Sequence, residues 1–341
     1  MADSGNLNWL IMKAIVYTEY GPPDVLRFEE VVKPVPKNNE VLIRVAATTV
    51  TATDCIFRRG TPFFSRLFTG LTKPKNPILG SEFAGQIEVS GNDVKNFKGG
   101  DRVYGTLPGY GAYAEYICLP AYNSTLALMP SNAAYEEALG CCDGFLTALP
   151  FLRDKGKIKK GRKILINGAS GSVGSAAVQL AKHFGAEVTG VCSETNKSLV
   201  KSLGADKVID YAKEDFTETG KTYDIVFDTA GNVSFSKTKK ALTRTGLFLK
   251  AGITPGIFPS VIRTSIIGRQ KAVIMATGLR SPLERSKDLI FIKGLMEAGK
   301  IKPVIDRSYP LEQIAEAHRY VDRGHKKGNV VITINWNKSN L

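Results

Sequence analysis

The stretch KILINGASGSVGSAAVQLAKHFGAEVTGVC, residues 163–192, decides the fold of the central part of the chain. Lys163–Asn167 is a short apolar run, which predicts a β-strand. Ser175–Phe184 carries apolar residues at helical spacing, which predicts an α-helix. A second apolar run, AEVTGVC, follows the helix. The order of strand, helix and strand predicts one unit of a parallel sheet.

The connection between the first strand and the helix has the spacing of a dinucleotide-binding turn, with alanine in place of its first glycine. In that pattern Gly171 lets the backbone approach a pyrophosphate and Gly174 lets the helix pack closely, while the helix N-terminus offers free N–H groups. We therefore expect a dinucleotide cofactor to bind along the six residues of this turn: Ala169, Ser170, Gly171, Ser172, Val173 and Gly174.

The end of the second strand indicates which dinucleotide is preferred. NAD enzymes place an acidic side chain about 20 residues after the central glycine, where it binds the ribose 2′-hydroxyl. Here Cys192 and Ser193 hold that place. A 2′-phosphate meets no carboxylate there, and Ser193, Lys197 and Tyr211 can contact it. We therefore expect NADPH as the cofactor; a one-residue shift would instead put Glu194 on the ribose.

Hydrophobic rhythm divides the chain into two parts. Before Met129, short apolar runs alternate with Pro, Gly and Asn clusters, which is typical of an irregular β domain. From Lys163 onward, helical segments separate most of the runs KILING, AEVTGVC, DKVID, YDIVFDT, LFLKAG and KAVIMAT. This alternation predicts a parallel sheet covered on both faces. We also expect Gly252, the last residue of LFLKAG, among the cofactor-binding residues.

Composition excludes several classes of protein. With 341 residues, 43% of them hydrophobic, the chain is long enough for two domains and is not disordered. It has no membrane-length apolar run and no signal-peptide pattern, so we expect a cytoplasmic protein. The five cysteines form no CxxC pair, and the three histidines, His183, His318 and His325, are expected at exposed positions. Neither a disulfide framework nor a histidine-rich metal site is therefore expected.

Six stretches share the pattern of one enzyme family: MKAIVYTEYGPPDVLRFEE, GSEFAGQIEVSGNDVKNFKGGDRVYG, GASGSVGSAAVQLAKHFGA, SLGADKVIDY, YDIVFDTAG and PVIDRSYPLEQIAEAHRYVDRGHKKGNVVITI. On these stretches the chain resembles the zinc-free quinone oxidoreductase branch of the medium-chain dehydrogenase/reductase superfamily, from Met12 to Ile334. The resemblance implies a GroES-like β domain built from residues 1–128 and 279–341, with 1–11 as an extension. It also implies a Rossmann domain over 129–278, with Thr147 beside the nicotinamide.

The zinc positions of that superfamily are altered here. Where the zinc enzymes read Cys-x-Thr-Asp, this chain reads Thr51-Ala52-Thr53-Asp54, and Ser81 stands where they have a histidine. Cys141 or Cys142 falls near the third ligand, but one thiolate cannot hold zinc. We therefore expect no metal. Asp54 is expected to have a structural task, such as accepting backbone N–H bonds, and it joins Thr51 and Thr147 in the predicted catalytic set.

Loss of the metal changes the chemistry that is accessible. Reducing a simple ketone creates an alkoxide, which the zinc relatives stabilise with a Lewis acid. Hydride delivery to an enone or a quinone leaves a delocalised anion, which a few hydrogen bonds can stabilise, with Thr51 as the expected donor. These points predict NADPH-dependent reduction of a hydrophobic quinone or α,β-unsaturated carbonyl compound. The alternative substrate is an unsaturated acyl thioester.

Basic segments account for much of the net charge of +14. Arg153–Lys163 carries seven positive charges and one negative charge, and is expected at the end of the sheet opposite the cofactor. Phe57–Lys75 interleaves five positive charges with four phenylalanines. We expect it to overhang the cleft that the resemblance implies between the two domains, with Phe57–Phe68 as a lid. The alternative is a binding protein that uses these segments on an anionic membrane or nucleic acid.

The run RQKAVIMAT, Arg269–Thr277, is expected to be the last strand of the Rossmann sheet. An apolar edge strand favours aggregation unless it is paired or covered. The family resemblance implies pairing with a second copy about a two-fold axis, which predicts a homodimer.

Overall fold

The computed structural model describes residues 11–107, 109–252 and 255–335, which form two compact units. The first unit contains the described residues up to Cys142, Pro282–Glu297 and the residues from Ile305 onward; the second contains the described residues of Asp143–Ser281 together with Ala298–Val304. The expected limits of independent domains, 128/129 and 278/279, stay a prediction. Residues 129–142 pack with the first unit and not with the parallel sheet, because helix α3 (Tyr135–Leu139) lies against strands of the first unit.

The first unit is built on antiparallel β-structure. Strands β1 (Ile11–Val16) and β2 (Arg27–Val32) form a hairpin-like pair. The larger sheet runs in the order β14-β15-β3-β4-β5-β7, with β6 also paired to β3. Its strands are β3 (Glu40–Thr49), β4 (Glu82–Ser90), β5 (Arg102–Thr106), β6 (Tyr116–Pro120), β7 (Thr125–Leu128), β14 (Ile305–Pro310) and β15 (Asn329–Thr333).

The returning chain completes this sheet from the far end of the sequence. β15 pairs with β3 in antiparallel register, with Ile332 opposite Thr48, and β14 pairs with β15 in parallel. The other helices of the unit are α1 (Ala52–Arg59), α2 (Arg66–Thr69), α9 (Pro282–Glu297) and α10 (Ile314–Asp322). Its hydrophobic core joins side chains from both ends of the chain, for example Ile43, Phe83 and Ile332.

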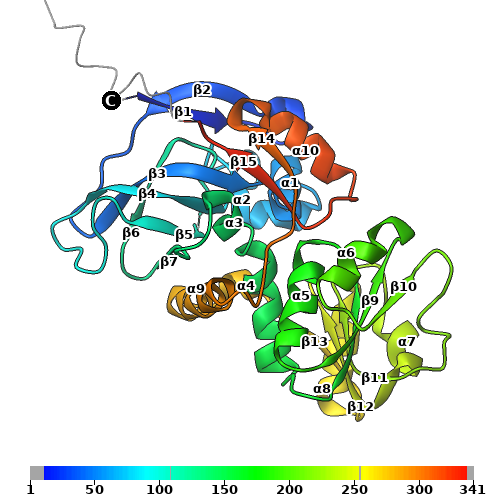
Figure 1. Ribbon diagram of the computed structural model, residues 1–341. Coiled ribbons are helices and arrows are strands. Elements are labelled where there is room, and N and C mark those ends of the chain that lie inside the picture. The colour runs from blue at the N-terminus through cyan, green and yellow to red at the C-terminus, as the bar shows by residue number, and fades with distance from the viewer. Residues whose placement is uncertain (1–10, 108, 253–254, 336–341) are drawn as a thin grey trace, which may run out of the picture. The chain divides into compact units, whose positions relative to one another are not determined.

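The second unit is a six-stranded parallel sheet in the order β10-β9-β8-β11-β12-β13 (Figure 1, green to yellow). The strands are β8 (Lys163–Asn167), β9 (Glu187–Cys192), β10 (Lys207–Asp210), β11 (Tyr223–Asp228), β12 (Leu242–Lys250) and β13 (Lys271–Ile274). The helices are α4 (Asp143–Pro150), α5 (Ser172–His183), α6 (Lys197–Ser202), α7 (Phe235–Thr238) and α8 (Phe258–Ile266). The strand order reverses between β8 and β11, and ligands of such sheets bind at the carboxyl ends of the strands there.

The predicted fold class, a GroES-like β domain with a Rossmann sheet, is confirmed. The predicted strand Lys163–Asn167 is β8. Helix α5 begins at Ser172, three residues before the predicted start. Gly171 is its N-cap, so the helix follows the turn without an intervening loop. The predicted edge strand Arg269–Thr277 is shorter, since only Lys271–Ile274 pairs with β12.

Among the helices of the described residues, none combines the length and the apolar character that crossing a bilayer requires.

Candidate functional site

The turn between β8 and α5 is held in place by the neighbouring strand. The N–H groups of Gly168 and Ala169 both donate to the carbonyl of Val191 at the end of β9, over 3.1 and 2.9 Å. Gly168 has a φ of 81°, which favours glycine, and an added Cβ would lie 2.9 Å from Thr229 Oγ1. The predicted pattern began at Ala169 and missed this glycine. The turn is therefore a rigid feature at the carboxyl edge of the sheet.

The two glycines of the predicted pattern have different tasks. A Cβ on Gly174 would lie 2.0 Å from the carbonyl oxygen of Gly168, so only glycine lets α5 pack on the turn. A Cβ on Gly171 would meet nothing closer than 3.6 Å, and its φ of −76° suits any residue. The protein's own packing therefore does not require glycine at 171. The open space beside Gly171 would let a pyrophosphate group approach the protein backbone closely.

The start of α5 supplies the chemistry for an anion. The first N–H groups of an α-helix have no partner within the helix, and the helix dipole favours negative charge there. Ser172 is buried and its hydroxyl donates to Asp143 Oδ2 over 3.2 Å, while Ser170 and Val173 are half-buried beside it. The residues present at this turn thus fit a diphosphate group.

A charged cluster stands at the end of β9. Lys213 and Lys197 both donate to Glu194 Oε2, over 2.7 and 3.2 Å, and together they lower the pKa of Glu194 to about 2. Lys213 Nζ also lies 4.0 Å from Asp210 Oδ2, so two lysines and two carboxylates stand together at this edge. Sequence reasoning found Lys197 but missed Lys213, whose position depends on the loop after β10.

The other residues predicted to bind the cofactor's 2′-phosphate also lie around the end of β9. Ser193 directly follows β9, and its hydroxyl shares a hydrogen bond with Thr195. The N–H of Tyr211 donates to the Cys192 carbonyl over 3.2 Å, and its ring is 62% exposed. Asn196 Nδ2 donates to Ser170 Oγ over 3.1 Å, which ties this edge to the turn before α5. Asn196 Oδ1 is buried without a hydrogen-bond partner among the described residues.

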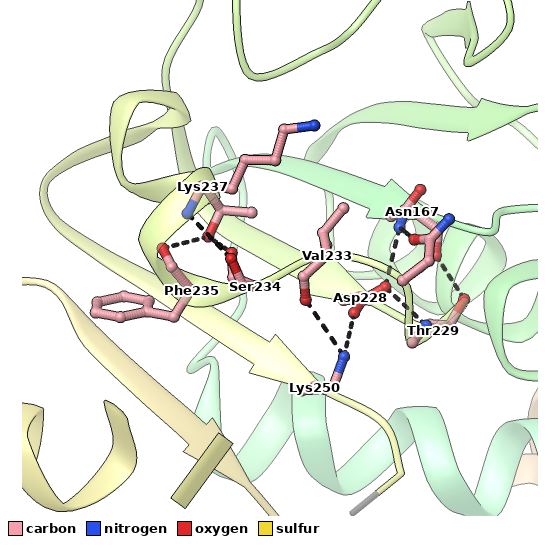
Figure 2. A network of polar contacts seen from close by, with 11 residues as sticks. Asn167, Asp228, Thr229, Val233, Ser234, Phe235, Lys237 and Lys250 are labelled. Atoms are coloured by element: carbon pink, nitrogen blue, oxygen red, sulfur yellow. Dashed lines mark hydrogen bonds and ion pairs between the residues drawn. The ribbon is translucent and has the colours of Figure 1, made fainter. Parts of the chain in front are cut away.

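A buried polar network links the ends of β8, β11 and β12 (Figure 2). Asp228 Oδ2 accepts from Lys250 Nζ over 2.6 Å, and Asp228 Oδ1 accepts from Asn167 Nδ2 over 2.9 Å and from the N–H of Gly231 over 3.0 Å. Lys250 also donates to the carbonyl of Val233 over 3.4 Å. The network fixes the loop that follows β11 at the switch point of the sheet.

Sequence reasoning missed these residues, although a signal existed. Asn167, Asp228 and Lys250 are the polar residues that end the apolar runs KILIN, YDIVFD and LFLK, and their strands are neighbours in the sheet. Gly252 follows Lys250 by two residues, has a φ of 84° and is exposed. The structure thus places Gly252 at the same carboxyl edge.

Thr147 is half-buried in α4 and belongs to this unit. It lies one helical turn after Asp143, on the same face of the helix. Asp143 accepts from Ser172, and a Cβ on Gly144 would lie 2.4 Å from the Ser172 carbonyl oxygen. The start of α4 therefore packs directly on the start of α5.

Thr51 and Asp54 belong to the first unit and form the capping box of α1. The N–H and the hydroxyl of Thr51 donate to Asp54 Oδ2 over 2.8 and 2.7 Å, and the Asp54 N–H donates back to Thr51 Oγ1 over 3.1 Å. Asp54 thus accepts a backbone N–H, as expected of a structural residue. A catalytic role for either residue stays a prediction.

The expectation for His318 was wrong, because its side chain is fully buried. Arg58 NH1 lies 3.1 Å from His318 Nδ1, and Tyr113 Oη lies 3.2 Å from His318 Nε2. Burial, with the nearby charges of Arg58 and Arg59, moves the pKa of His318 well below its usual value, so the ring is neutral. His183 and His325 are exposed, as expected.

At the positions where zinc enzymes of the superfamily have metal ligands, the residues of this chain make contacts within the protein. Ser81 accepts at its carbonyl from the Leu107 N–H over 2.7 Å, and the Cys142 thiol faces the Gly105 carbonyl at 3.9 Å. Across the residues that the structure describes, no three His, Cys, Asp or Glu side chains gather into a metal site. The absence of zinc stays a prediction that rests on Thr51 and Ser81.

Two protein families match the chain. Residues 37–131 match the Alcohol dehydrogenase GroES-like domain, and residues 203–332 match a family described as Zinc-binding dehydrogenase. The second description names zinc, yet residues 203–332 contain no cysteine and do not include Thr51 or Ser81. We therefore take that match as support for the fold and not for a metal.

Relatives match over nearly the whole chain. The Arabidopsis thaliana Chloroplast envelope quinone oxidoreductase homolog is 33% identical over 94% of this chain and 98% of its own length. The NADPH-dependent alkenal/one oxidoreductase, chloroplastic, of the same plant is 32% identical over 94% of this chain and 79% of its own. The structure of the quinone oxidoreductase from Coxiella burnetii has a TM-score of 0.84 at 28% identity, and covers 95% of this chain and 100% of that one. The chain therefore belongs to the quinone oxidoreductase branch of the medium-chain dehydrogenase/reductase superfamily and is an oxidoreductase.

Proposed function

We propose that this protein is a zinc-independent, NADPH-dependent enzyme that reduces quinones or α,β-unsaturated carbonyl compounds by hydride transfer. The observation that carries the proposal is the space beside Gly171, in a turn that Gly174 and the Val191 carbonyl hold rigid. The names of relatives that act on quinones and on alkenals or alkenones support it.

The chain's own residues would bind the cofactor in three parts. The start of α5 and the turn from Ala169 to Gly174 would hold the diphosphate. Ser193, Lys197 and Lys213 would contact the 2′-phosphate, and Tyr211 would lie beside it or the adenine. Thr147 and Gly252 would face the nicotinamide, which supplies the hydride when it is bound.

The acceptor class follows from the residues at the former zinc positions. Thr51 and Ser81 offer no ligand set for a Lewis acid, so a substrate that delocalises its own charge is favoured. Hydride addition to the β-carbon of an enone leaves an enolate, and a proton from water completes the reduction. Thr51 would stabilise the anion by turning its hydroxyl away from Asp54, which leaves the backbone N–H of Thr51 to hold that carboxylate.

Substrate panels test the reaction class. We expect NADPH oxidation, followed by its absorbance, to be faster with quinones, enones or enals than with simple ketones. Unsaturated acyl thioesters belong in the same panel, because they are the alternative acceptors. Faster turnover of simple ketones and alcohols than of every conjugated acceptor would refute the proposal. Elemental analysis of the purified protein should find no stoichiometric zinc, and chelators should leave the activity unchanged.

Cofactor preference has its own test. NADPH should bind more tightly than NADH, and Lys197→Ala should weaken NADPH by about 1–3 kcal/mol, the scale of a hydrogen bond to a charged group. Lys201→Ala is the matched control, since Lys201 is an exposed lysine one turn further along α6. Equal affinity of the parent protein for both cofactors would contradict the preference.

A homodimer is also proposed. β13 is the edge strand of the parallel sheet, and α8, which packs against it, exposes Ile262 and Ile266 by 61% and 75%. Pairing of two β13 edges would cover such a surface. Sedimentation should find a dimer, and a monomer at every concentration would exclude it.

A further inference from the structure

The segment Phe63–Leu71 of the first unit has its polar and apolar residues reversed relative to an ordinary surface helix. Phe63–Ser65 is a 3₁₀ turn that leads into α2, so the segment is helical from 63 to 69. The two residues that point inward are polar, since Ser65 and Thr69 are 1% and 5% exposed. The outer stripe is large and apolar: Phe63 (66% exposed), Phe64 (44%), Leu67 (68%), Phe68 (61%) and Leu71 (57%).

Contacts on the inner face hold the segment in this orientation. Tyr20 Oη shares a hydrogen bond with Thr69 Oγ1 over 2.8 Å and donates to the Gly70 carbonyl over 2.5 Å. Arg66 donates to the Gly60 carbonyl over 3.0 Å, and its guanidinium lies over the Tyr20 ring at 4.6 Å. The outer stripe is therefore presented outward by specific hydrogen bonds on the opposite side of the segment.

Two lysines follow the outer stripe, and the surrounding part of the sequence contains no acidic residue. No Asp or Glu occurs between Asp54 and Glu82, and both of these are buried. Lys73 and Lys75 are exposed and form no ion pair within the described residues. The Lys75 N–H donates to the Thr69 carbonyl over 2.7 Å, so this basic loop folds back beside the stripe.

We propose that the outer stripe, with Lys73 and Lys75, is a docking surface for an anionic lipid bilayer. Exposed aromatic and leucine side chains insert at the boundary between headgroups and acyl chains, and adjacent lysines pair with lipid phosphates. A large exposed apolar patch marks an interaction site. A nucleic acid would use the lysines but would leave the aliphatic residues Leu67 and Leu71 in water. The charge and the apolar face together therefore favour lipid.

The test measures binding of the full chain to vesicles, in the absence of cofactor and substrate. We expect the protein to sediment with vesicles of phosphatidylcholine and phosphatidylglycerol at low salt, and to bind pure phosphatidylcholine at least tenfold more weakly. Because no turnover is measured, failure of this proposal is distinguishable from failure of the proposed reaction.

Two pairs of substitutions separate the apolar and the charged contributions. Leu67→Ser/Phe68→Ser should weaken vesicle binding about tenfold or more, because both side chains lose their burial in the bilayer. Lys73→Ala/Lys75→Ala should weaken it by roughly fivefold for each lysine removed. The matched controls are Val32→Ser/Val35→Ser, which are 78% and 79% exposed elsewhere in the unit, and Lys95→Ala/Lys98→Ala, two exposed lysines between β4 and β5. Both controls should change the affinity less than twofold.

Three results would overturn the proposal. The first is no binding of the parent protein to anionic vesicles at low salt. The second is equal loss of binding in the stripe variants and the controls. The third is tighter binding to single-stranded RNA than to vesicles, lowered by Lys73→Ala/Lys75→Ala and unaffected by Leu67→Ser/Phe68→Ser. Circular dichroism of each variant verifies that it is folded, and Leu67→Ala/Phe68→Ala replaces the serine pair if that pair unfolds.

Discussion

Asp228 and Lys250 form an ion pair with an Nζ–Oδ2 distance of 2.6 Å at the carboxyl ends of neighbouring strands, and their side chains are 0% and 4% exposed. Asn167 Nδ2 and the Gly231 N–H both donate to Asp228 Oδ1, so the carboxylate accepts hydrogen bonds from three donors. The pair thereby fixes the loop after β11 at the edge where the cofactor is proposed to bind.

Breaking this pair on one side should be costly. Lys250→Met leaves Asp228 as a buried charge without its cation, and we expect a loss of about 3–5 kcal/mol in the free energy of unfolding. The double variant Asp228→Asn/Lys250→Met removes both charges and should lose clearly less. Urea denaturation followed by circular dichroism measures both. A double variant that is less stable than Lys250→Met would show that the ion pair is not the main contribution.

The glycines of the turn before α5 should respond in opposite ways. Gly174→Ala places a Cβ 2.0 Å from the Gly168 carbonyl oxygen, so we expect a loss of about 1–3 kcal/mol in stability together with weaker NADPH binding. Gly171→Ala meets no such contact, and its stability should stay within about 1 kcal/mol of the parent, because the entropy gain of alanine opposes its weaker N-capping. Its NADPH affinity should nevertheless fall at least tenfold, because the methyl group fills the space proposed for the diphosphate.

Thermal unfolding and NADPH fluorescence titration separate the two variants. Parent-like NADPH binding by Gly171→Ala would show that the diphosphate does not approach this residue. A fully stable Gly174→Ala would show that α5 moves easily on the turn.

Local features of the sequence were sufficient for the strand, turn and helix at 163–183, because apolar spacing and glycine geometry act over a few residues. His318 illustrates what such features miss. Its neighbour Tyr113 lies 205 residues away in the chain, so its burial depends on tertiary packing that no local pattern encodes. The same holds for Asp228 and Lys250, whose strand ends become neighbours only in the sheet. The outward face of Phe63–Leu71 also opposed the usual rule that apolar residues point inward.

Burial of His318 predicts a specific dependence of stability on pH. Its pKa lies well below 6.5 in the folded protein and near 6.5 in the unfolded chain, so below about pH 6.5 the unfolded state binds more protons. Stability should therefore fall as the pH drops below about 6.5, by up to about 1.4 kcal/mol per pH unit from this residue. The groups that face the ring are Arg58, Tyr113 and Cys55.

Urea unfolding between pH 7 and pH 5 checks this dependence. His318→Gln should be less stable at pH 7 but should lose less stability than the parent on acidification. His325→Gln is the control, because His325 is exposed and should keep the parent's profile. Identical slopes for the parent and His318→Gln would contradict the assignment of the pH dependence to this histidine.

Thr51 combines a capping role seen in the structure with a proposed catalytic one, and two substitutions separate them. Thr51→Val keeps the shape but removes the hydroxyl that accepts from the Asp54 N–H and donates to Asp54 Oδ2, so the free energy of unfolding should fall by about 0.5–2 kcal/mol. Thr51→Ser keeps the hydroxyl and should restore most of that stability.

If the hydroxyl also stabilises the anion formed on the substrate, kcat of Thr51→Val should drop by about a hundredfold, with KM for NADPH unchanged, and Thr51→Ser should recover it. The measurement is steady-state NADPH oxidation with a quinone and with an enone, at a temperature where both variants are folded. A Thr51→Val enzyme with parent-like kcat and reduced stability would show that Thr51 caps α1 and takes no part in the reaction.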